Sequence, residues 1–349
     1  MEGVILSNWV RMCFEGFVQA GAPADALLAG MRPTDWVSRP LMPVSVMQVN
    51  RLFEQAARLL PGQSLPHCAV SRLDLTTYHA LGYALMAAPT LLDAGRIICR
   101  YDMALSNVVR LRLQEVPEGY ALIIRIPDRH TLHPLIPATC LSLAIRTLRV
   151  LSAGQASPLR VTTRASCSAP YHAWADRLEC PVAWGSSEHA VYVDAASMHR
   201  WRPGGDPALM VDSLRLCDRY FRTLGRQRTA DRLAVVLRDR LGSDPGLDQA
   251  AEALGMSPRT LQHHLSREGL CYRDVLDEVR REQALHLICH TDASVTDIAL
   301  SLGFAEPANF TRAFRRWYQC APTDYRQATR HVRSHRQQTV AATLPADPD

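Results

Sequence analysis

Two short segments in the C-terminal third of the chain carry polar side chains that suit contact with the edges of nucleic-acid bases. The first segment has Arg259, Gln262 and His263 on one side of a predicted helix, and the second has Asn309 and Arg312 in similar positions. An Arg guanidinium can donate two parallel hydrogen bonds to guanine, and an Asn or Gln amide can pair in the same way with adenine. These residue types therefore predict direct contact with DNA bases.

Each polar segment follows a glycine turn, and apolar residues at four-residue spacing hold the helix that carries it. Gly255 and Gly303 each end a short amphipathic helix, where a sharp turn between two helices needs permissive backbone. Leu261 and Leu265 then anchor the first polar helix, and two Phe residues take their places in the second. The pattern predicts a helix-turn-helix motif that occurs twice.

The two motifs are joined by YRDVLDEVRREQALHLI, which has continuous helical periodicity. Its 17 residues would span roughly 25 Å as a helix. A rod of this length can hold two recognition helices near one helical turn of DNA apart, roughly 34 Å. We therefore expect both helices to enter successive major grooves. A plain helical bundle is the alternative, but it does not explain why the outer faces collect Arg, Gln, His and Asn.

Basic charge is concentrated near the second motif. The chain has a net charge of +5, and all 39 of its basic residues are Arg. Residues 305–336 contain seven Arg and only two acidic residues. A local basic face of this kind is the expected footprint of phosphate binding.

The first 205 residues mix helical and strand patterns. Helical periodicity is present over residues 8–21, 44–60, 89–105 and 134–151. Strand alternation over 107–116 and 119–128 predicts a hairpin, and two further strands are expected over 159–165 and 188–194. This order predicts an α+β domain with helices packed on a small antiparallel sheet.

A Pro/Gly cluster over residues 202–207 marks the predicted end of this domain. We divide the chain into a sensing or dimerisation domain (1–205), a linker helix (206–227), an all-α domain (228–331) and a disordered tail (332–349). The linker helix has Leu216, Tyr220 and Leu224 on one stripe. It either lies on its own domain or pairs with a second copy of the chain.

The C-terminal segments resemble the DNA-binding domain of the AraC/XylS family of bacterial transcription regulators. The likeness covers residues 228–331 and rests on GFAEPANFTRAFRRWYQCAPTDYR, GMSPRTLQHHL and VRREQALHLI. It implies an all-α domain with two helix-turn-helix motifs joined by a linking helix. The implied DNA contacts are Arg259, Gln262, His263, Pro307, Ala308, Asn309, Thr311 and Arg312, and we add the exposed Arg315 and Arg316.

Three residues depart from the usual family pattern. His263 stands where many members have Arg, Ala305 replaces a Ser before the second recognition helix, and Gln319 occupies a position where Gly commonly ends that helix. The Ser would cap the helix and contribute about 1 kcal/mol. We therefore expect weaker end signals in the second motif than in the first.

The N-terminal half is similar to a domain found in a subgroup of the same family, often described as arabinose-binding-like. ALGYALMAAPTLLDAGRIICRYDMAL and CPVAWGSSEHAVYVD carry this likeness. It implies effector sensing and dimerisation, although not arabinose itself. Polar residues set in apolar segments are candidates for effector contacts, and an Arg among them would suit a carboxylate ligand; they are His79, Arg125, His133, Arg146 and Trp184.

Several function classes lack a signal in this sequence. It has no recognisable catalytic motif, and its ten cysteines form no CxxC or Cys/His cluster, so we expect no enzyme activity, metal or cofactor. It has no signal peptide and no membrane-spanning apolar run, which indicates a cytoplasmic protein.

The predicted function is sequence-specific regulation of transcription, as an activator, by a homodimer that binds double-stranded DNA and responds to a small-molecule effector. RNA polymerase is an expected partner. One alternative is an N-terminal domain that only dimerises and binds no ligand. Another is an N-terminal domain with an enzymatic activity.

Overall fold

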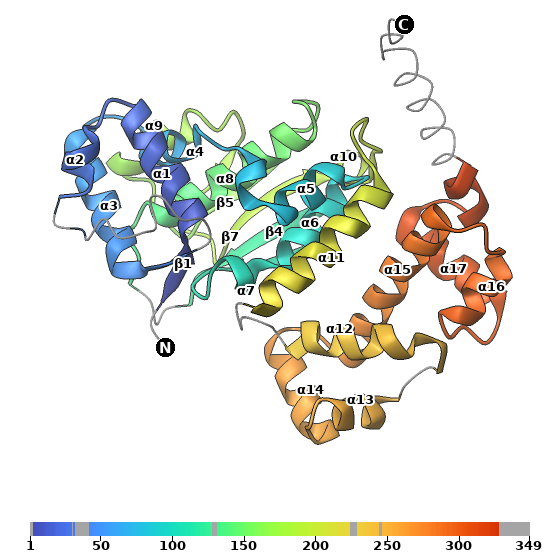
Figure 1. Ribbon diagram of the computed structural model, residues 1–349. Helices are drawn as coiled ribbons and strands as arrows, with labels where there is room; N and C mark the ends of the chain where they lie inside the picture. Colours follow the sequence, from blue (N-terminus) through green and yellow to red (C-terminus); the bar gives the residue numbers. More distant parts are fainter. Residues whose placement is uncertain are drawn as a thin grey trace, which may run out of the picture. The chain divides into compact units, whose positions relative to one another are not determined.

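A computed structural model describes residues 3–29, 31, 42–127, 131–223, 229–243 and 246–327 (Figure 1). The chain forms two units, Met1–Phe221 and Arg222–Asp349. The predicted tail, residues 332–349, lies outside the described residues.

A five-stranded sheet organises the first unit. Its strands are β3 (Arg110–Val116), β4 (Gly119–Arg125), β5 (Arg160–Thr162), β6 (Val182–Ala183) and β7 (His189–Asp194), in the order β3-β4-β7-β5-β6. The predicted β3–β4 hairpin is confirmed, and only the β5–β6 pair is parallel. Gly119 is required at the hairpin turn, because its φ is 145° and a Cβ there would lie 2.3 Å from the Val193 carbonyl oxygen.

Helices pack on this sheet, as the sequence predicts for an α+β domain. The helices of the first unit are α1 (Ser7–Gln19), α2 (Ala24–Leu27), α3 (Val46–Leu59), α4 (Leu65–Val70), η1 (Leu75–Tyr78), α5 (Ala80–Ala87), α6 (Leu91–Arg100), α7 (Asp102–Leu105), α8 (Ile136–Leu151), α9 (Ala169–Ala175), α10 (Ala195–His199) and α11 (Pro207–Thr223). A separate two-stranded sheet pairs β1 (Val4–Leu6) with β2 (Pro43–Ser45). Among these helices, α6 packs on β3, and α8 packs on β4 and β7.

The single helix predicted over residues 89–105 is wrong, because the chain breaks at Tyr101 into α6 and α7. Tyr101 leaves helical geometry with φ −98° and ψ 11° and is buried. Its hydroxyl donates to the Asp218 carboxylate at 2.7 Å. The break between α6 and α7 thus coincides with a tertiary contact between Tyr101 and Asp218. Local periodicity in the sequence does not show such a contact.

Arg202 is a buried cation in the first unit, although it belongs to the Pro/Gly cluster that the sequence marked as a boundary. Its guanidinium donates to carbonyl oxygens of Leu151 (2.6 Å), Leu85 (3.1 Å), Ala88 (2.6 Å) and Met86 (3.2 Å). These carbonyls lie at the C-terminal ends of α5 and α8, where the helix itself supplies no donor. Arg202 therefore joins the ends of two helices.

Helix α11 continues the first unit beyond this cluster. One face is buried, with Met210, Leu214 and Phe221 among its residues. The opposite face leaves Leu216 and Tyr220 exposed, at 47% and 40%. Leu224, the third residue of the predicted stripe, lies outside the described residues. Helix α11 thus packs on its own domain and still presents an apolar stripe.

The second unit is all-α, as predicted, with two helix-turn-helix motifs joined by a linking helix. Its elements are α12 (Thr229–Arg240), η2 (Leu241–Ser243), α13 (Leu247–Ala253), α14 (Pro258–Arg267), α15 (Tyr272–His290), α16 (Val295–Ser301) and α17 (Pro307–Tyr318). Helix α12 contacts α13, α14 and α15. The Glu268 carboxylate accepts the backbone N–H groups of Thr229 and Ala230, at 2.8 and 3.1 Å, and so caps the start of α12.

Candidate nucleic-acid interface

The first helix-turn-helix motif consists of α13 and α14. Gly255 forms the turn with a φ of 67°, a left-handed conformation that favours glycine. The Ser257 hydroxyl accepts the Thr260 N–H at 3.1 Å, and Pro258 occupies the first helical position. Leu261 and Leu265 are fully buried, which confirms their role as anchors. The sequence signals at this motif thus all act as expected.

The outer face of α14 carries the three predicted contact residues. The side chains of Arg259, Gln262 and His263 are all exposed. The spacing of three and four residues places them on the side opposite the buried leucines. The structure therefore leaves these three side chains exposed on the surface of α14.

The second motif consists of α16 and α17 and repeats the first frame with larger anchors. Gly303 has a φ of 74°. Phe310 and Phe314 are fully buried, and Trp317 donates its indole N–H to the Asp277 carboxylate at 2.9 Å. Because Asp277 lies on α15, this bond fixes α17 to the linking helix.

The predicted contact residues on α17 differ in what their side chains do. Pro307 and Thr311 are half-buried, whereas the others are exposed: Ala308, Asn309, Arg312, Arg315 and Arg316. The Thr311 hydroxyl donates to the Pro307 carbonyl at 3.1 Å, so it is engaged within its own helix. Arg312 donates to the Asn309 side-chain oxygen at 2.6 Å. Asn309 and Arg312 thus form a prearranged polar pair on the surface.

Arg316 serves the helix packing as well as the surface. Its guanidinium lies 2.6 Å from the Asp277 carboxylate, although its side chain is 65% exposed. Asp277 therefore receives both Arg316 and Trp317 from α17. This geometry assigns Arg316 a positioning contact in the protein that the sequence alone did not reveal.

Two arginines of α15 that the sequence did not single out contact the second motif. Arg280 donates to the carbonyl oxygens of Leu302 and Gly303, at 2.9 and 3.0 Å, and so caps the end of α16. Arg281 is buried and forms an ion pair with Glu278 at 2.7 Å. Basic residues in a long helix usually indicate an exposed face. The position of Arg280 and Arg281 in the linking-helix segment was therefore the one sequence feature that pointed to these structural contacts.

The ends of α17 are weakly specified, as expected, although the capping position is Glu306 and not Ala305 as the sequence suggested. The helix begins after Glu306 with no side-chain cap, and it ends at Gln319 in the left-handed conformation, with φ 58° and ψ 15°. Most residues other than glycine avoid this conformation, because Cβ approaches the following carbonyl. The second motif therefore carries local strain at its C-terminus.

We predict that Gln319→Gly stabilises the second unit by about 0.5–1 kcal/mol, because glycine adopts the left-handed conformation without this steric cost. Thermal and chemical unfolding of the full chain measure the change. The matched control is Gln283→Gly in the middle of α15, which should destabilise by about 1 kcal/mol. Destabilisation by both substitutions would contradict the assignment of strain to Gln319.

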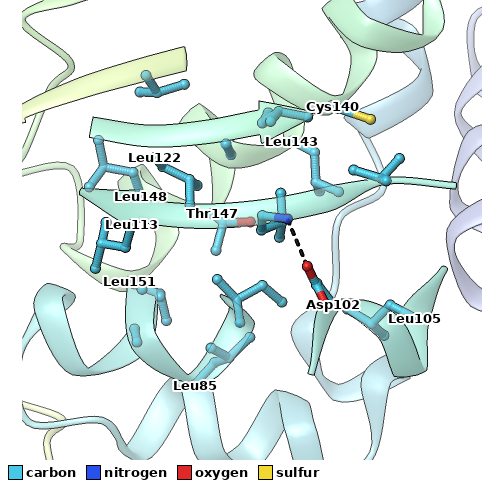
Figure 2. A pocket seen from close by; sticks show the side chains of 18 of the residues that line it. Leu85, Asp102, Leu105, Leu113, Leu122, Cys140, Leu143, Thr147, Leu148 and Leu151 are labelled. Carbon is cyan, nitrogen blue, oxygen red and sulfur yellow. Dashed lines mark hydrogen bonds between the residues drawn. The ribbon is translucent and has the colours of Figure 1, made fainter. Parts of the chain in front are cut away.

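The first unit contains a cavity of about 200 Å³ between the sheet and helices α6 and α8 (Figure 2). Leu113 and Leu122, which are paired across the β3–β4 hairpin, line one side, and α8 contributes Leu143. Burial raises the pKa of the Cys140 thiol to about 12 and also raises the pKa of the Tyr78 hydroxyl. Both groups are therefore uncharged at neutral pH, and the lining is mainly aliphatic.

Two family models match this chain. A helix-turn-helix domain matches residues 250–328, which contain both motifs except the start of α13. The arabinose-binding domain of the AraC transcription regulator, N-terminal, matches residues 21–201, more than half of the chain. The chain belongs to the AraC family of transcription regulators. It is therefore a DNA-binding regulator of transcription.

Relatives of this AraC-family chain include regulators matched over most of their length. The ornithine utilization regulator of Pseudomonas aeruginosa is 28% identical over 290 residues, which cover 82% of this chain and 85% of the relative. The transcriptional activator RhaS of Escherichia coli is 36% identical over 105 residues, 29% of this chain and 38% of RhaS. Among solved structures, the transcriptional regulator CdpR from Pseudomonas aeruginosa has a TM-score of 0.40 and 23% identity, and the match covers 79% of this chain and 90% of CdpR.

The polar residues suggested by the sequence as effector contacts do not line the cavity of this AraC-family chain. They are His79, Arg125, His133, Arg146 and Trp184. Arg146 is exposed on α8 and donates to the Ser71 carbonyl at 2.9 Å, and Trp184 packs against Trp174 with 5.9 Å between ring centroids. The sequence does not reveal this cavity, because an aliphatic lining has the same sequence pattern as a filled core.

The described part of the AraC-family chain lacks two other kinds of site, a membrane-spanning helix and a metal centre. No helix there is both long and apolar enough to span a bilayer. No group of three or more His, Cys, Asp or Glu side chains is placed there to hold a metal ion.

Proposed function

We propose that this protein is a transcription activator that reads two successive major grooves with α14 and α17, under the control of a small molecule bound in the first unit. The observation that carries the DNA-reading part is the presence of two recognition helices at the two ends of α15. This helix has 19 residues and is therefore roughly 28 Å long. One turn of DNA is about 34 Å, which is compatible with this separation.

The proposed contacts divide into two groups by their surroundings. Arg259, Gln262 and His263 on α14, together with the Asn309–Arg312 pair on α17, would read base edges. The remaining α17 residues would lie along the phosphate backbone or against thymine methyl groups. They are Pro307, Ala308, Thr311, Arg315 and Arg316. The transcriptional activator RhaS matches 105 residues of this chain, which supports an activating role. An activator of this kind would have RNA polymerase as a partner.

The experiment that tests two-groove reading is footprinting on a selected operator. The full chain is used to enrich binding sites from random duplex DNA, and hydroxyl-radical footprinting then maps the contacts. We expect each protomer to give two protected patches on one face of the duplex, about 10 base pairs apart. Insertion of about half a helical turn between them should abolish one patch. A single patch that is insensitive to the insertion would contradict the proposal.

Control by an effector is supported by a direct connection between the cavity and α11. Leu91 and Ile98 of α6 line the cavity. At the end of α6, Arg100 forms an ion pair with Asp218 of α11 at 3.1 Å, and Tyr101 donates to the same carboxylate. A ligand that shifts α6 would therefore bias α11, the last helix before the DNA-binding unit in the chain.

Dimerisation is proposed to use the exposed stripe of α11, which includes Leu209, Leu216 and Tyr220. We predict that Leu216→Glu converts a dimer to a monomer, because a charged side chain would be buried without a partner. Light scattering after size-exclusion chromatography measures the mass. Val150→Glu on α8, where the valine is 50% exposed, is the matched control and should remain dimeric. A dimer that persists in the Leu216 variant would place the contact elsewhere.

A further inference from the structure

The cavity of the first unit is bounded by a continuous aliphatic surface from the sheet. Leu111 is paired with Ile124 between β3 and β4, and Leu122 is paired with Val191 between β4 and β7. All four line the cavity, as does Gly95 on α6 opposite them. Because side chains alternate along a strand, the same face of three adjacent strands points into this space. The sheet therefore offers a ligand an apolar wall.

Charged ligands find no suitable partner in this lining. No Arg or His side chain is among the described residues that surround the cavity, and Asp102 is the one carboxylate there. Asp102 is 3% exposed, and it accepts the backbone N–H of Leu111 at 2.8 Å (Figure 2). A bound carboxylate would be buried near a second carboxylate without a cation to offset the cost. A sugar would bury several hydroxyl groups against leucine side chains.

The Tyr78 hydroxyl is a group in this lining that is suited to bind a ligand. It is buried and has no hydrogen-bond partner among the described residues. By contrast, the Tyr120 hydroxyl is bonded to His199 at 3.1 Å, and the Ser106 hydroxyl accepts the N–H of Val108 at 3.0 Å. A buried hydroxyl without a partner raises the free energy of the folded protein. A ligand oxygen next to Tyr78 would remove this cost.

We propose that the cavity binds an uncharged aliphatic molecule with one polar end group, such as a medium-chain alcohol, aldehyde or ketone. Its chain contacts the aliphatic wall of the sheet, and its oxygen accepts a hydrogen bond from Tyr78. Apolar burial supplies the affinity, and the single hydrogen bond fixes the orientation. This assignment rests on the proposed effector control and names the class of effector.

The test is a titration of the full chain, without DNA, with hexanol, octanol, decanol and dodecanol. Arabinose, ornithine and decanoate are the comparison ligands. Trp9 lines the cavity, so its fluorescence reports occupancy, and Trp9→Phe gives the blank signal. We expect affinity to rise with chain length until the cavity is filled. Decanol should bind about tenfold or more tightly than decanoate.

Two substitutions locate the binding site. Tyr78→Phe should weaken decanol binding by about fivefold and leave decane binding unchanged, because only the alcohol uses the hydroxyl. Tyr83→Phe, where the tyrosine is 48% exposed, is the matched control and should change neither. Ala144→Leu adds apolar volume to the cavity lining and should weaken both ligands by about tenfold. If that variant does not fold, the comparison of decane with decanol in Tyr78→Phe still decides the question.

Tighter binding of arabinose or decanoate than of decanol would overturn the proposal, as would an absence of binding by all the alcohols. An equal loss of decane and decanol in Tyr78→Phe would overturn the role of the hydroxyl. These outcomes are separate from the operator footprint, which needs no ligand. A missing footprint with normal decanol binding would refute the proposed DNA reading and leave the ligand class intact.

Discussion

Replacing Arg202 with Met is expected to lower the free energy of unfolding of the first unit by about 3–5 kcal/mol, because each buried carbonyl that loses its donor costs roughly 1–3 kcal/mol. The guanidinium holds four carbonyl oxygens at the ends of α5 and α8. Methionine has a similar volume but no donor. The effect should be among the largest of any single substitution outside the aromatic core.

Thermal unfolding of the full chain measures this loss, and hydrogen exchange localises it to α5 and α8. Arg200→Met is the matched control, because Arg200 is exposed two residues away and should change stability by less than about 0.5 kcal/mol. Arg202→Lys should have an intermediate effect, since one ammonium group cannot reach all the carbonyls in a planar arrangement. Equal losses in the Arg200 and Arg202 variants would show that the carbonyl contacts contribute little.

The double variant Arg259→Ala with Arg312→Ala is expected to weaken operator binding by roughly 30-fold to 25,000-fold. Each arginine that contacts a base contributes about 1–3 kcal/mol. Arg259 lies on α14 and Arg312 on α17, in separate motifs that come before and after α15 in the chain. Since the two sites share no partner, their effects should add. Fluorescence anisotropy at fixed salt measures the affinity for the selected operator. Each single variant should lose about half of the binding free energy that the double variant loses.

The control for this prediction removes the same charge from positions outside the proposed contacts. Arg267 and Arg273 are both exposed, and their double Ala variant should weaken operator and random DNA alike, by a smaller factor. The Arg259 and Arg312 variant should instead lose specificity for the operator. The same loss on both DNAs in the two double variants would mean that these arginines act only through charge.

The DNA-binding unit could be predicted almost completely because its signals are local. Gly255, Ser257 and Leu261 lie close together in the sequence, and the structure uses each of them as the spacing indicated. The end signals at Gln319 were predicted for the same reason. What remained hidden were the contacts of Arg280 and Arg316, whose partners lie more than twenty residues away.

The first unit was predicted only at the level of its fold class. Arg202 gains its role from carbonyls near residues 85 and 151, and no local pattern connects these segments. The cavity is assembled from the sheet and from α6 and α8, and its leucines have the same pattern as a filled core. Polar residues in apolar segments, such as Arg146, were therefore a poor guide to the binding site.

The Asp218 contact of α11 has a thermodynamic consequence for the proposed regulation. Because α6 both lines the cavity and holds α11 through Arg100 and Tyr101, ligand and operator would act on one shared equilibrium. Linkage then requires reciprocity: the factor by which the ligand changes operator affinity is the factor by which the operator changes ligand affinity. Adding operator DNA would alter how much ligand the protein retains, so the abundance of target promoters would set the effector concentration at which it responds.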